Sequence, residues 1–268
     1  DAEQFERIHR AHDQVVVVTG SANGIGKALC DACHQAGARK VVVTDIDLAG
    51  AQAVARRIDG DAYRVDVSQE REITDMIDAV EAAHGPIGLF CSNAGVALGF
   101  DADFTNAAQA SNDLWALSWQ VNVMAHIYAA RALIPRMKAR GGGYFLNTLS
   151  AAGLLSQVGS ATYATTKHAA VGFAENLAIT HRDDGIRVTI LCPQGVDTDM
   201  LRNIPDGPQS LDGALSPEQV AQCALTAISN EEFLALPHPQ VLGYMQNKTK
   251  DYDRWIGGMV KLQRAMQA

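Results

Sequence analysis

The stretch Thr19-Gly20-Ser21-Ala22-Asn23-Gly24-Ile25-Gly26 directly follows four consecutive valines near the start of the 268-residue chain. A short β-branched run of this kind predicts a strand that is covered on both faces, as in a parallel sheet. The glycines allow a tight turn and a close approach of the backbone to a pyrophosphate. A helix starting there would present free N–H groups to the anion. The pattern predicts a phosphate-binding turn, with a ligand-free glycine turn as the alternative. Its residues are Gly20, Asn23, Gly24, Ile25 and Gly26.

The rest of the chain alternates short apolar runs with longer segments of helical pattern. This order predicts an α/β fold, a single-domain doubly wound Rossmann-type parallel sheet of about seven strands with helices on both faces. The strands are expected at 15–19, 41–45, 62–65, 87–92, 144–149, 188–192 and 233–236. The helices are expected near 25–37, 48–58, 69–83, 112–139, 161–182 and 217–229.

No linker or repeat divides the chain, so we expect one dinucleotide-binding and catalytic domain over residues 1–268. Within it we expect a polar N-terminal extension at 1–13, a substrate loop at 199–215 and a helical tail at 238–268. Loops as long as 199–215 in a compact domain often bind ligands, although a plain surface connection remains the alternative.

The composition excludes several classes of protein. Apolar residues make up 47% and charged residues 19%, as in an ordinary globular domain. The net charge of −8 argues against nucleic-acid binding, and no apolar run approaches the roughly 18–20 residues of a membrane span. Five scattered cysteines and a polar N-terminus favour reduced thiols and a cytoplasmic protein. We expect no metal site, and we expect the Cys30-x-x-Cys33-His34 pattern to be buried helix packing.

Asp45 ends the second predicted strand, about twenty residues after the glycine turn. A carboxylate there can accept hydrogen bonds from the adenosine ribose and would repel a 2′-phosphate. Neither Asn23 nor Ile46 offers the cation that a phosphate-preferring site would need. The pattern favours NAD over NADP, with a turn or capping aspartate as the alternative.

Tyr163 and Lys167 lie four residues apart on a predicted helix, which places both on one face. A phenol with a pKa near 10 is a poor base at neutral pH, but a neighbouring ammonium and a positively charged nicotinamide ring would stabilise its phenolate. Ser150 follows the fifth predicted strand, where strand carboxyl ends line a ligand crevice, and could hydrogen-bond the same substrate oxygen. An exposed helix pair and a turn serine are the alternatives.

Together these motifs resemble the short-chain dehydrogenase/reductase family, from about Val15 to Phe233. The resemblance implies that Ser150 positions the substrate oxygen, Tyr163 is the general acid/base, and Lys167 lowers the tyrosine pKa and binds the nicotinamide ribose. It implies that Asn122 holds a water in a proton relay. The implied cofactor contacts are completed by Asp66, Val67, Asn93, Ala94, Gly95, Pro193, Val196 and Thr198.

One position departs from the family pattern. Gln194 stands where the family's Pro-Gly-x-Val-x-Thr motif has a glycine, so we expect a changed loop shape near the nicotinamide if that position needs positive φ.

We therefore expect an NAD-dependent oxidoreductase that interconverts a secondary alcohol and a ketone by hydride transfer. The alternatives are an NADP-linked ketone reductase and a catalytically silent NAD-sensing or scaffold protein. The candidate pocket predicts a neutral, fairly apolar small-molecule substrate. Its residues are Leu98, Ala152, Leu155, Met200 and Leu201, with Val96, Leu154 and Ile204 beside them.

The tail carries one apolar helical stripe that includes Tyr252, Trp255 and Ile256. The family resemblance implies a homo-oligomer, a dimer or a tetramer, and the stripe is either its interface or intrachain packing.

Overall fold

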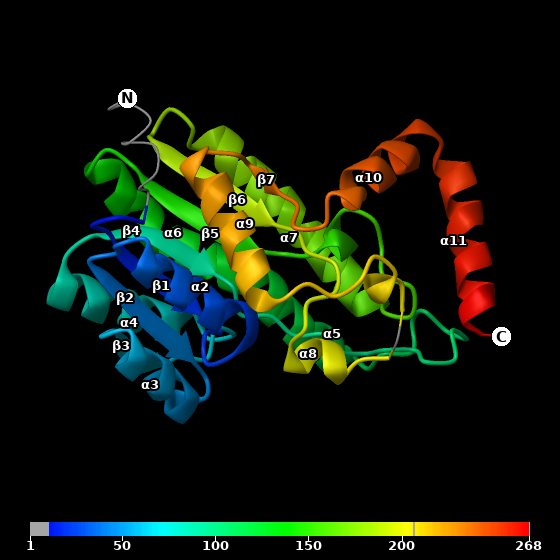
Figure 1. The fold of residues 1–268 in the computed structure, drawn as a ribbon, viewed down its shortest axis with the longest axis horizontal. Coiled ribbons are helices and arrows are strands. Elements are labelled where there is room, and N and C mark those ends of the chain that lie inside the picture. The colour runs from blue at the N-terminus through cyan, green and yellow to red at the C-terminus, as the bar shows by residue number, and fades with distance from the viewer. Residues whose placement is uncertain (1–10, 206, 268) are drawn as a thin grey trace.

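The computed structural model describes residues 11–205 and 207–267 (Figure 1). They form a seven-stranded sheet of order β3-β2-β1-β4-β5-β6-β7 in which every neighbouring pair is parallel. The predicted doubly wound fold is therefore confirmed. The strands are β1 (Val15–Thr19), β2 (Lys40–Asp45), β3 (Asp61–Arg64), β4 (Ile87–Ser92), β5 (Gly143–Thr148), β6 (Ile186–Leu191) and β7 (Leu234–Ala235).

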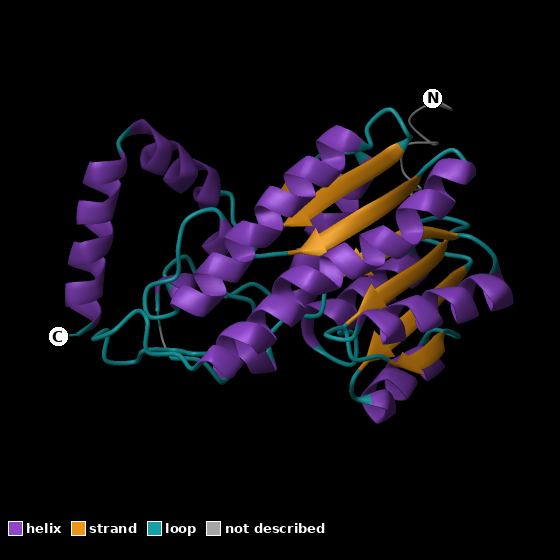
Figure 2. Cartoon of the chain, turned by 180° about the vertical axis from the view of Figure 1, so that it is seen from behind, coloured by secondary structure: helices purple, strands orange, loops and turns teal. Residues whose placement is uncertain are grey.

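Helices cover both faces of the sheet (Figure 2). One face packs against α2 (Gly24–Gln35), α3 (Leu48–Arg57) and α9 (Pro217–Ser229). The other face packs against α4 (Glu70–His84), α6 (Ala125–Ala139) and α7 (Ala161–Thr180). The strand order reverses between β1 and β4, which is where a doubly wound sheet opens a ligand crevice.

Local sequence signals explain several helix ends. The Asp47 side chain accepts a hydrogen bond from the Gly50 N–H and caps α3, as its position before the helix predicts. Ser216 and Gln219 form the predicted capping box at the start of α9. Cys30 and Cys33 lie in α2 and are fully buried, so the prediction of buried helix packing is confirmed.

The predicted helix over 112–139 is interrupted. It consists of α5 (Asn112–Trp119), a π-helical turn η1 (Gln120–Met124) and α6. Such turns are rare and are found at functional sites. The apolar periodicity of the sequence continues through η1, so the sequence pattern does not predict this interruption of the helix.

The C-terminal segment forms α10 (Gln240–Lys250) and α11 (Tyr252–Met266), which extend away from the sheet as an arm (Figure 1). Lys248 anchors this arm by donating hydrogen bonds to the main-chain carbonyls of Leu154 and Leu155, at 2.9 and 2.7 Å. Much of the apolar stripe on α11 is exposed, including Tyr252 and Ile256. The intrachain packing alternative thus accounts for little of it, and its use as an oligomer interface stays a prediction.

Residues 1–10 of the predicted N-terminal extension lie outside the described residues. Within residues 11–205 and 207–267, no helix combines the length and hydropathy needed to cross a bilayer.

Candidate active site

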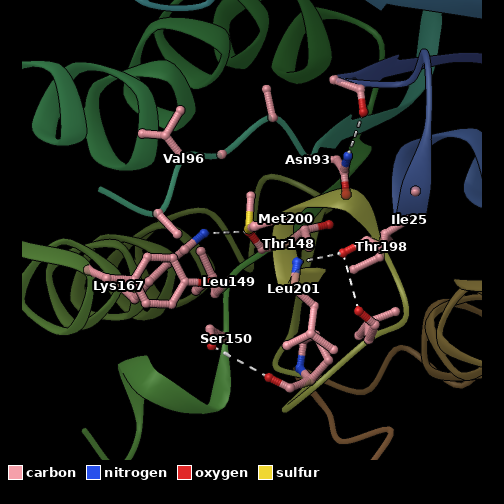
Figure 3. A pocket seen from close by; sticks show the side chains of 18 of the residues that line it. Ile25, Asn93, Val96, Thr148, Leu149, Ser150, Lys167, Thr198, Met200 and Leu201 are labelled. Carbon is pink, nitrogen blue, oxygen red and sulfur yellow. Dashed lines mark hydrogen bonds between the residues drawn. The ribbon is translucent and has the colours of Figure 1, made fainter. Parts of the chain in front are cut away.

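A cavity of about 550 Å³ opens at the carboxyl ends of the strands, over the β1/β4 reversal. Its wall combines the glycine turn with residues that follow β2, β3, β4, β5 and β6. The structure thus brings together segments that lie far apart in the sequence (Figure 3). All of the predicted cofactor-binding residues line it, namely Gly20, Asn23, Gly24, Ile25, Gly26, Asp45, Ile46, Asp66, Val67, Asn93, Ala94, Gly95, Tyr163, Lys167, Pro193, Val196 and Thr198.

The glycine turn requires the absence of side chains. Gly20 has φ +60°, and a Cβ there would lie 2.6 Å from the Cα of Ala94. A Cβ on Gly26 would lie 2.1 Å from the carbonyl oxygen of Gly20. The turn therefore packs its own backbone closely while leaving its outer side open to the cavity.

The N-terminus of α2 suits an anion. Asn23 precedes the helix, but its side chain makes no capping hydrogen bond. The first turn of α2 contains no acidic residue. Its free N–H groups and the positive end of the helix dipole are therefore available to a phosphate, and the residues present fit a dinucleotide.

Asn93 holds the glycine turn against the end of β4. Its side-chain amide donates to the carbonyls of Thr19 and Gly20, both at 3.1 Å, and its main-chain N–H donates to the Thr19 hydroxyl at 2.9 Å. This residue fixes the shape of the cofactor pocket through hydrogen bonds to the main chain.

Two carboxylates stand at the ends of β2 and β3. One oxygen of Asp45 accepts a hydrogen bond from the Ala22 N–H at 3.0 Å and the other accepts from the Asp47 N–H at 2.9 Å. Asp66 accepts from the main chain and the hydroxyl of Ser68. These bonds hold both negative charges at the wall of the cavity, beside the glycine turn in the case of Asp45.

Ser150, Tyr163 and Lys167 converge on the same cavity from β5 and α7. The Lys167 Nζ lies 5.5 Å from the centre of the Tyr163 ring. It donates to the Thr148 carbonyl at 3.4 Å (Figure 3). The Ser150 hydroxyl accepts from the Ala152 N–H at 3.1 Å. The predicted helix pair is not an exposed one, since Lys167 is only 3% exposed.

Burial dominates the proton affinities of this group. It raises the pKa of the Tyr163 phenol above 10.0, while the neighbouring Ser150 hydroxyl acts in the opposite direction. It lowers the pKa of the Lys167 ammonium from 10.5 to about 8. In the protein alone, the Ser150 hydroxyl rather than the Lys167 ammonium is the group that lowers the pKa of the phenol, and desolvation outweighs it.

Asn122 lies behind the cavity wall, in η1, and is fully buried. Its side-chain oxygen accepts from the Val96 N–H at 2.9 Å, and its amide donates to the Val96 carbonyl and to the Thr166 hydroxyl. Both donor hydrogens of the amide are thus used in tying η1 to the segment after β4 and to α7. The side chain has little left to offer to a relay water.

The loop after β6 adopts an ordinary backbone at the position that departs from the family pattern. The φ of Gln194 is not positive, so a side chain at this position causes no backbone strain. Its N–H donates to the imidazole of His238 at 3.1 Å, and His238 also contacts the Gly213 carbonyl at 3.2 Å. His238, which sequence reasoning missed, joins this loop to the segment at 199–215.

The substrate side of the cavity agrees only in part with the predicted residues. Ala152, Met200 and Leu201 line it, as do Val96 and Ile204. The structure does not bring Leu98, Leu154 or Leu155 to this wall. The Leu98 carbonyl accepts a hydrogen bond from the Thr162 hydroxyl of α7, and the Leu154 and Leu155 carbonyls accept from Lys248 of α10. These three residues therefore lie in segments that face neighbouring helices.

Other parts of this wall carried no local sequence signal. Phe100, Leu117 and Val121 add apolar surface from the loop after β4 and from α5 and η1. Gln157 donates to the side-chain oxygen of Gln209 at 2.9 Å, which connects the segment after β5 to the loop at 199–215. Only the packing of the chain brings these residues together.

The cation of the predicted substrate loop at 199–215, Arg202, does not serve ligand binding. Arg202 is paired with Asp197 and Asp199, and all three side chains are more than half exposed. The cation is therefore engaged on the outside of the loop, and it is not among the residues that line the cavity.

Comparison with known proteins gives consistent relatives. The short chain dehydrogenase family model matches residues 14–209. A 1-deoxy-11-beta-hydroxypentalenate dehydrogenase of Streptomyces exfoliatus is 33% identical over 235 residues, which cover 82% of this chain and 81% of the relative. An epidermal retinol dehydrogenase 2 of Mus musculus is 29% identical over 236 residues, covering 84% and 74%.

Among solved structures, a short chain dehydrogenase/reductase from Burkholderia phymatum in complex with NAD superimposes with a TM-score of 0.79. It is 27% identical, and the match covers 90% of this chain and 95% of that one. Since the family model spans most of the chain and its motifs meet at one cavity, the chain belongs to the short-chain dehydrogenase/reductase family.

Proposed function

We propose that this protein is an NAD-dependent oxidoreductase that interconverts a secondary alcohol and a ketone. The observation that carries the proposal is the meeting of Ser150, Tyr163 and Lys167 with the glycine turn in one cavity. Relatives named as dehydrogenases of a hydroxypentalenate and of retinol support an alcohol as the class of substrate. A structural relative in complex with NAD supports the cofactor class.

The chain's own residues supply binding and proton transfer. The Gly20–Gly26 turn and α2 hold the pyrophosphate, and Asp45 accepts hydrogen bonds from the adenosine ribose. Bound NAD supplies the hydride acceptor of its nicotinamide ring. Ser150 orients the substrate oxygen. The Tyr163 phenolate takes the proton of the alcohol during oxidation, and the Tyr163 phenol returns it during reduction. The Lys167 ammonium stabilises the phenolate that results when Tyr163 gives up its own proton.

The negative charge beside the adenosine site favours NAD over NADP as the cofactor. The Asp45 carboxylate is held by two main-chain N–H groups and faces the cavity. A 2′-phosphate placed there would meet a fixed negative charge. Ile46, the next residue in the wall, offers no compensating cation.

The proposed substrate is neutral and mainly apolar. Its side of the cavity is formed by Val96, Phe100, Leu117, Met200 and Ile204. A pocket of this kind binds an alicyclic, aryl or long-chain alcohol better than a phosphorylated one.

The test is a panel of secondary alcohols with NAD, followed by NADH absorbance, for the wild type and for Tyr163→Phe. We expect at least ~10²-fold lower kcat for the variant, the usual scale of acid–base catalysis. NADH affinity, measured by fluorescence titration, should remain within about twofold of the wild type.

Unchanged turnover of Tyr163→Phe would remove the acid–base role of this residue. A wild type that binds NADH but turns over no member of the panel would favour a silent nucleotide-binding protein.

A further inference from the structure

Gln194 departs from the family motif, and it lies on the wall of the cavity. A glycine at this position has no side chain, so the wall carries an amide that the family pattern lacks. The side-chain oxygen of Gln194 is buried and has no hydrogen-bond partner among the described residues. An unpaired buried oxygen costs free energy, so the stability of the fold does not explain this side chain.

Hydrogen bonds fix the main chain around Gln194 beside Ser150. The Pro193 carbonyl accepts from the Ala151 N–H at 2.9 Å and from the Ser150 hydroxyl at 3.5 Å (Figure 3). The Gln194 N–H donates to the imidazole of His238 at 3.1 Å. The Gln194 amide is therefore carried on a well-held segment of main chain, one residue from the contact with Ser150.

A second amide comes to the same wall from the segment after β5. Gln157 lines the cavity, and its amide nitrogen donates to the Gln209 side-chain oxygen at 2.9 Å and to the Val158 carbonyl at 3.5 Å. Both hydrogens of this amide are thus engaged, and no described residue donates to its oxygen. The side-chain oxygen of Gln157 is the acceptor that remains for a ligand.

Gln209 brings the two amides together. Its main-chain carbonyl accepts from the Gly195 N–H at 2.7 Å, directly after Gln194, and its side chain accepts from Gln157. Its own amide nitrogen donates to the Pro205 carbonyl at 2.9 Å. A Cβ on Gly195 would lie 2.6 Å from the Gln209 carbonyl oxygen, so the two segments pack backbone to backbone. Gln157 and Gln194 therefore lie on either side of one fixed contact.

The charges of the cavity lie elsewhere. Among the described residues that line it, Lys167 is the only cation, and Asp45 and Asp66 are the only carboxylates. Both carboxylates stand at the proposed cofactor site, and Lys167 stands beside Tyr163. The wall around the two glutamines is uncharged and mainly apolar. Neutral amides in such a wall suit a neutral polar group of a ligand.

We infer that Gln157 and Gln194 form a polar subsite for a second hydroxyl of the substrate. The Gln157 oxygen accepts the hydrogen of this hydroxyl, and the Gln194 amide nitrogen donates to its oxygen. The substrate is then an otherwise apolar diol whose second hydroxyl lies in the same ring system as the reacting carbinol. The inference rests on the proposed function only for that carbinol, because binding of the second hydroxyl needs no turnover.

The first experiment measures binding to the complex of the wild type with NADH, in which alcohols do not react, by the change in NADH fluorescence. The ligands are cyclohexanol, a cyclohexanediol and the monomethyl ether of that diol, and the corresponding three derivatives of decalin. On the ring that binds better, we expect the diol to bind about 10-fold more tightly than the mono-alcohol, the scale of one net hydrogen bond. The ether, which can only accept at that oxygen, should fall between them. Equal Kd values on both rings, or no binding, would overturn the subsite.

The second experiment repeats these titrations with Gln194→Met, Gln157→Met and the double variant. Each single change removes one amide and keeps a side chain of similar length. We expect the preference for the diol, the ratio of the two Kd values, to fall about fivefold in each single variant and to vanish in the double variant. The ratio of the two kcat/KM values with NAD should fall in parallel.

The matched control is Gln222→Met on α9, an exposed glutamine that does not line the cavity. It should keep the wild-type ratio. A Gln194→Met protein that keeps the preference for the diol contradicts the role of this amide. One that loses NADH affinity assigns the amide to the cofactor and also overturns the subsite. If Gln194→Met does not fold, the ligand series on the wild type decides.

Binding and turnover separate the subsite from the proposed function. Diols that bind preferentially but are not oxidised would sustain the subsite and contradict the oxidoreductase. Oxidation of mono-alcohols and diols with equal kcat/KM would sustain the oxidoreductase and overturn the subsite.

Discussion

The two sides of the cavity are built in different ways. The cofactor side consists of main chain and of residues that end a strand or directly follow one, such as Asp45 and the glycine turn. The substrate side is assembled from loops and helix ends, including Phe100, Leu117 and Ile204. A dinucleotide presents the same phosphates and riboses to every protein of this kind, whereas the substrate differs, so only the first side needs a fixed local pattern.

The largest effect is expected where the cofactor side relies on close backbone packing. In Gly26→Ala the new Cβ would lie 2.1 Å from the Gly20 carbonyl and 2.6 Å from the Asn93 amide. We expect NADH affinity to fall at least ~100-fold, with a stability loss of about 1–3 kcal/mol from overpacking. Fluorescence titration and urea unfolding measure the two effects.

The control is Gly172→Ala in α7, where an added Cβ meets nothing within 4 Å. It should stabilise the protein by about 0.5–1 kcal/mol, since alanine favours a helix interior over glycine, and leave NADH affinity unchanged. Equal losses in both variants would contradict the role of the turn.

Lys167 lies between the two sides. We expect its buried ammonium to lower the stability of the folded protein while being needed for activity. Its pKa is about 8 in the folded protein against an ordinary value of 10.5, so the unfolded chain binds more protons between these values. Stability from this group therefore rises with pH through the window from about 8 to 10.5. At pH 7 the buried ammonium costs on the order of 3 kcal/mol, from 1.36 kcal/mol per pKa unit.

Lys167→Met should accordingly unfold at higher urea at pH 7 while losing activity. The difference between variant and wild type should shrink as the pH rises through the same window. A methionine variant that is less stable than the wild type at pH 7 would show that the ammonium is better compensated than its burial indicates.

The third prediction concerns cofactor preference. In Asp45→Ala, the ratio of kcat/KM with NAD to kcat/KM with NADP should fall about 10-fold, because the charge that repels a 2′-phosphate is lost. Asp47→Ala, two residues on, removes the cap of α3 and serves as a control for local damage. A wild type that already prefers NADP to NAD would contradict the proposed role of Asp45.

The smallest effect is expected on the substrate side. Ile204→Ala removes apolar surface from the cavity wall, so KM for the best alcohol should rise about fivefold, near the lower end for lost methylenes. NADH affinity should not change. Ile179→Ala, on α7 and 77% exposed, is the matched control. An equal rise in KM for both variants would mean that the loop does not contact substrate.

Sequence reasoning worked best where a residue's function follows from its place after a strand. Asp45 and Ser150 are assigned from positions at or just after a strand end, and both line the cavity. It was less successful for the substrate wall, where Leu98 and Leu155 turn their carbonyls to neighbouring helices. In a loop, side-chain direction depends on which helix packs nearby, and apolar composition does not reveal this.

The sequence by itself determined the order of the strands and helices, the glycine turn and the spacing of Tyr163 and Lys167, because each depends on neighbours in the chain. Only the tertiary structure decided the break at η1, the use of the Asn122 amide and the burial of His126. These features arise from contacts across the sheet and between helices. Such contacts follow from packing and from the pairing of buried polar groups, which a linear pattern does not record.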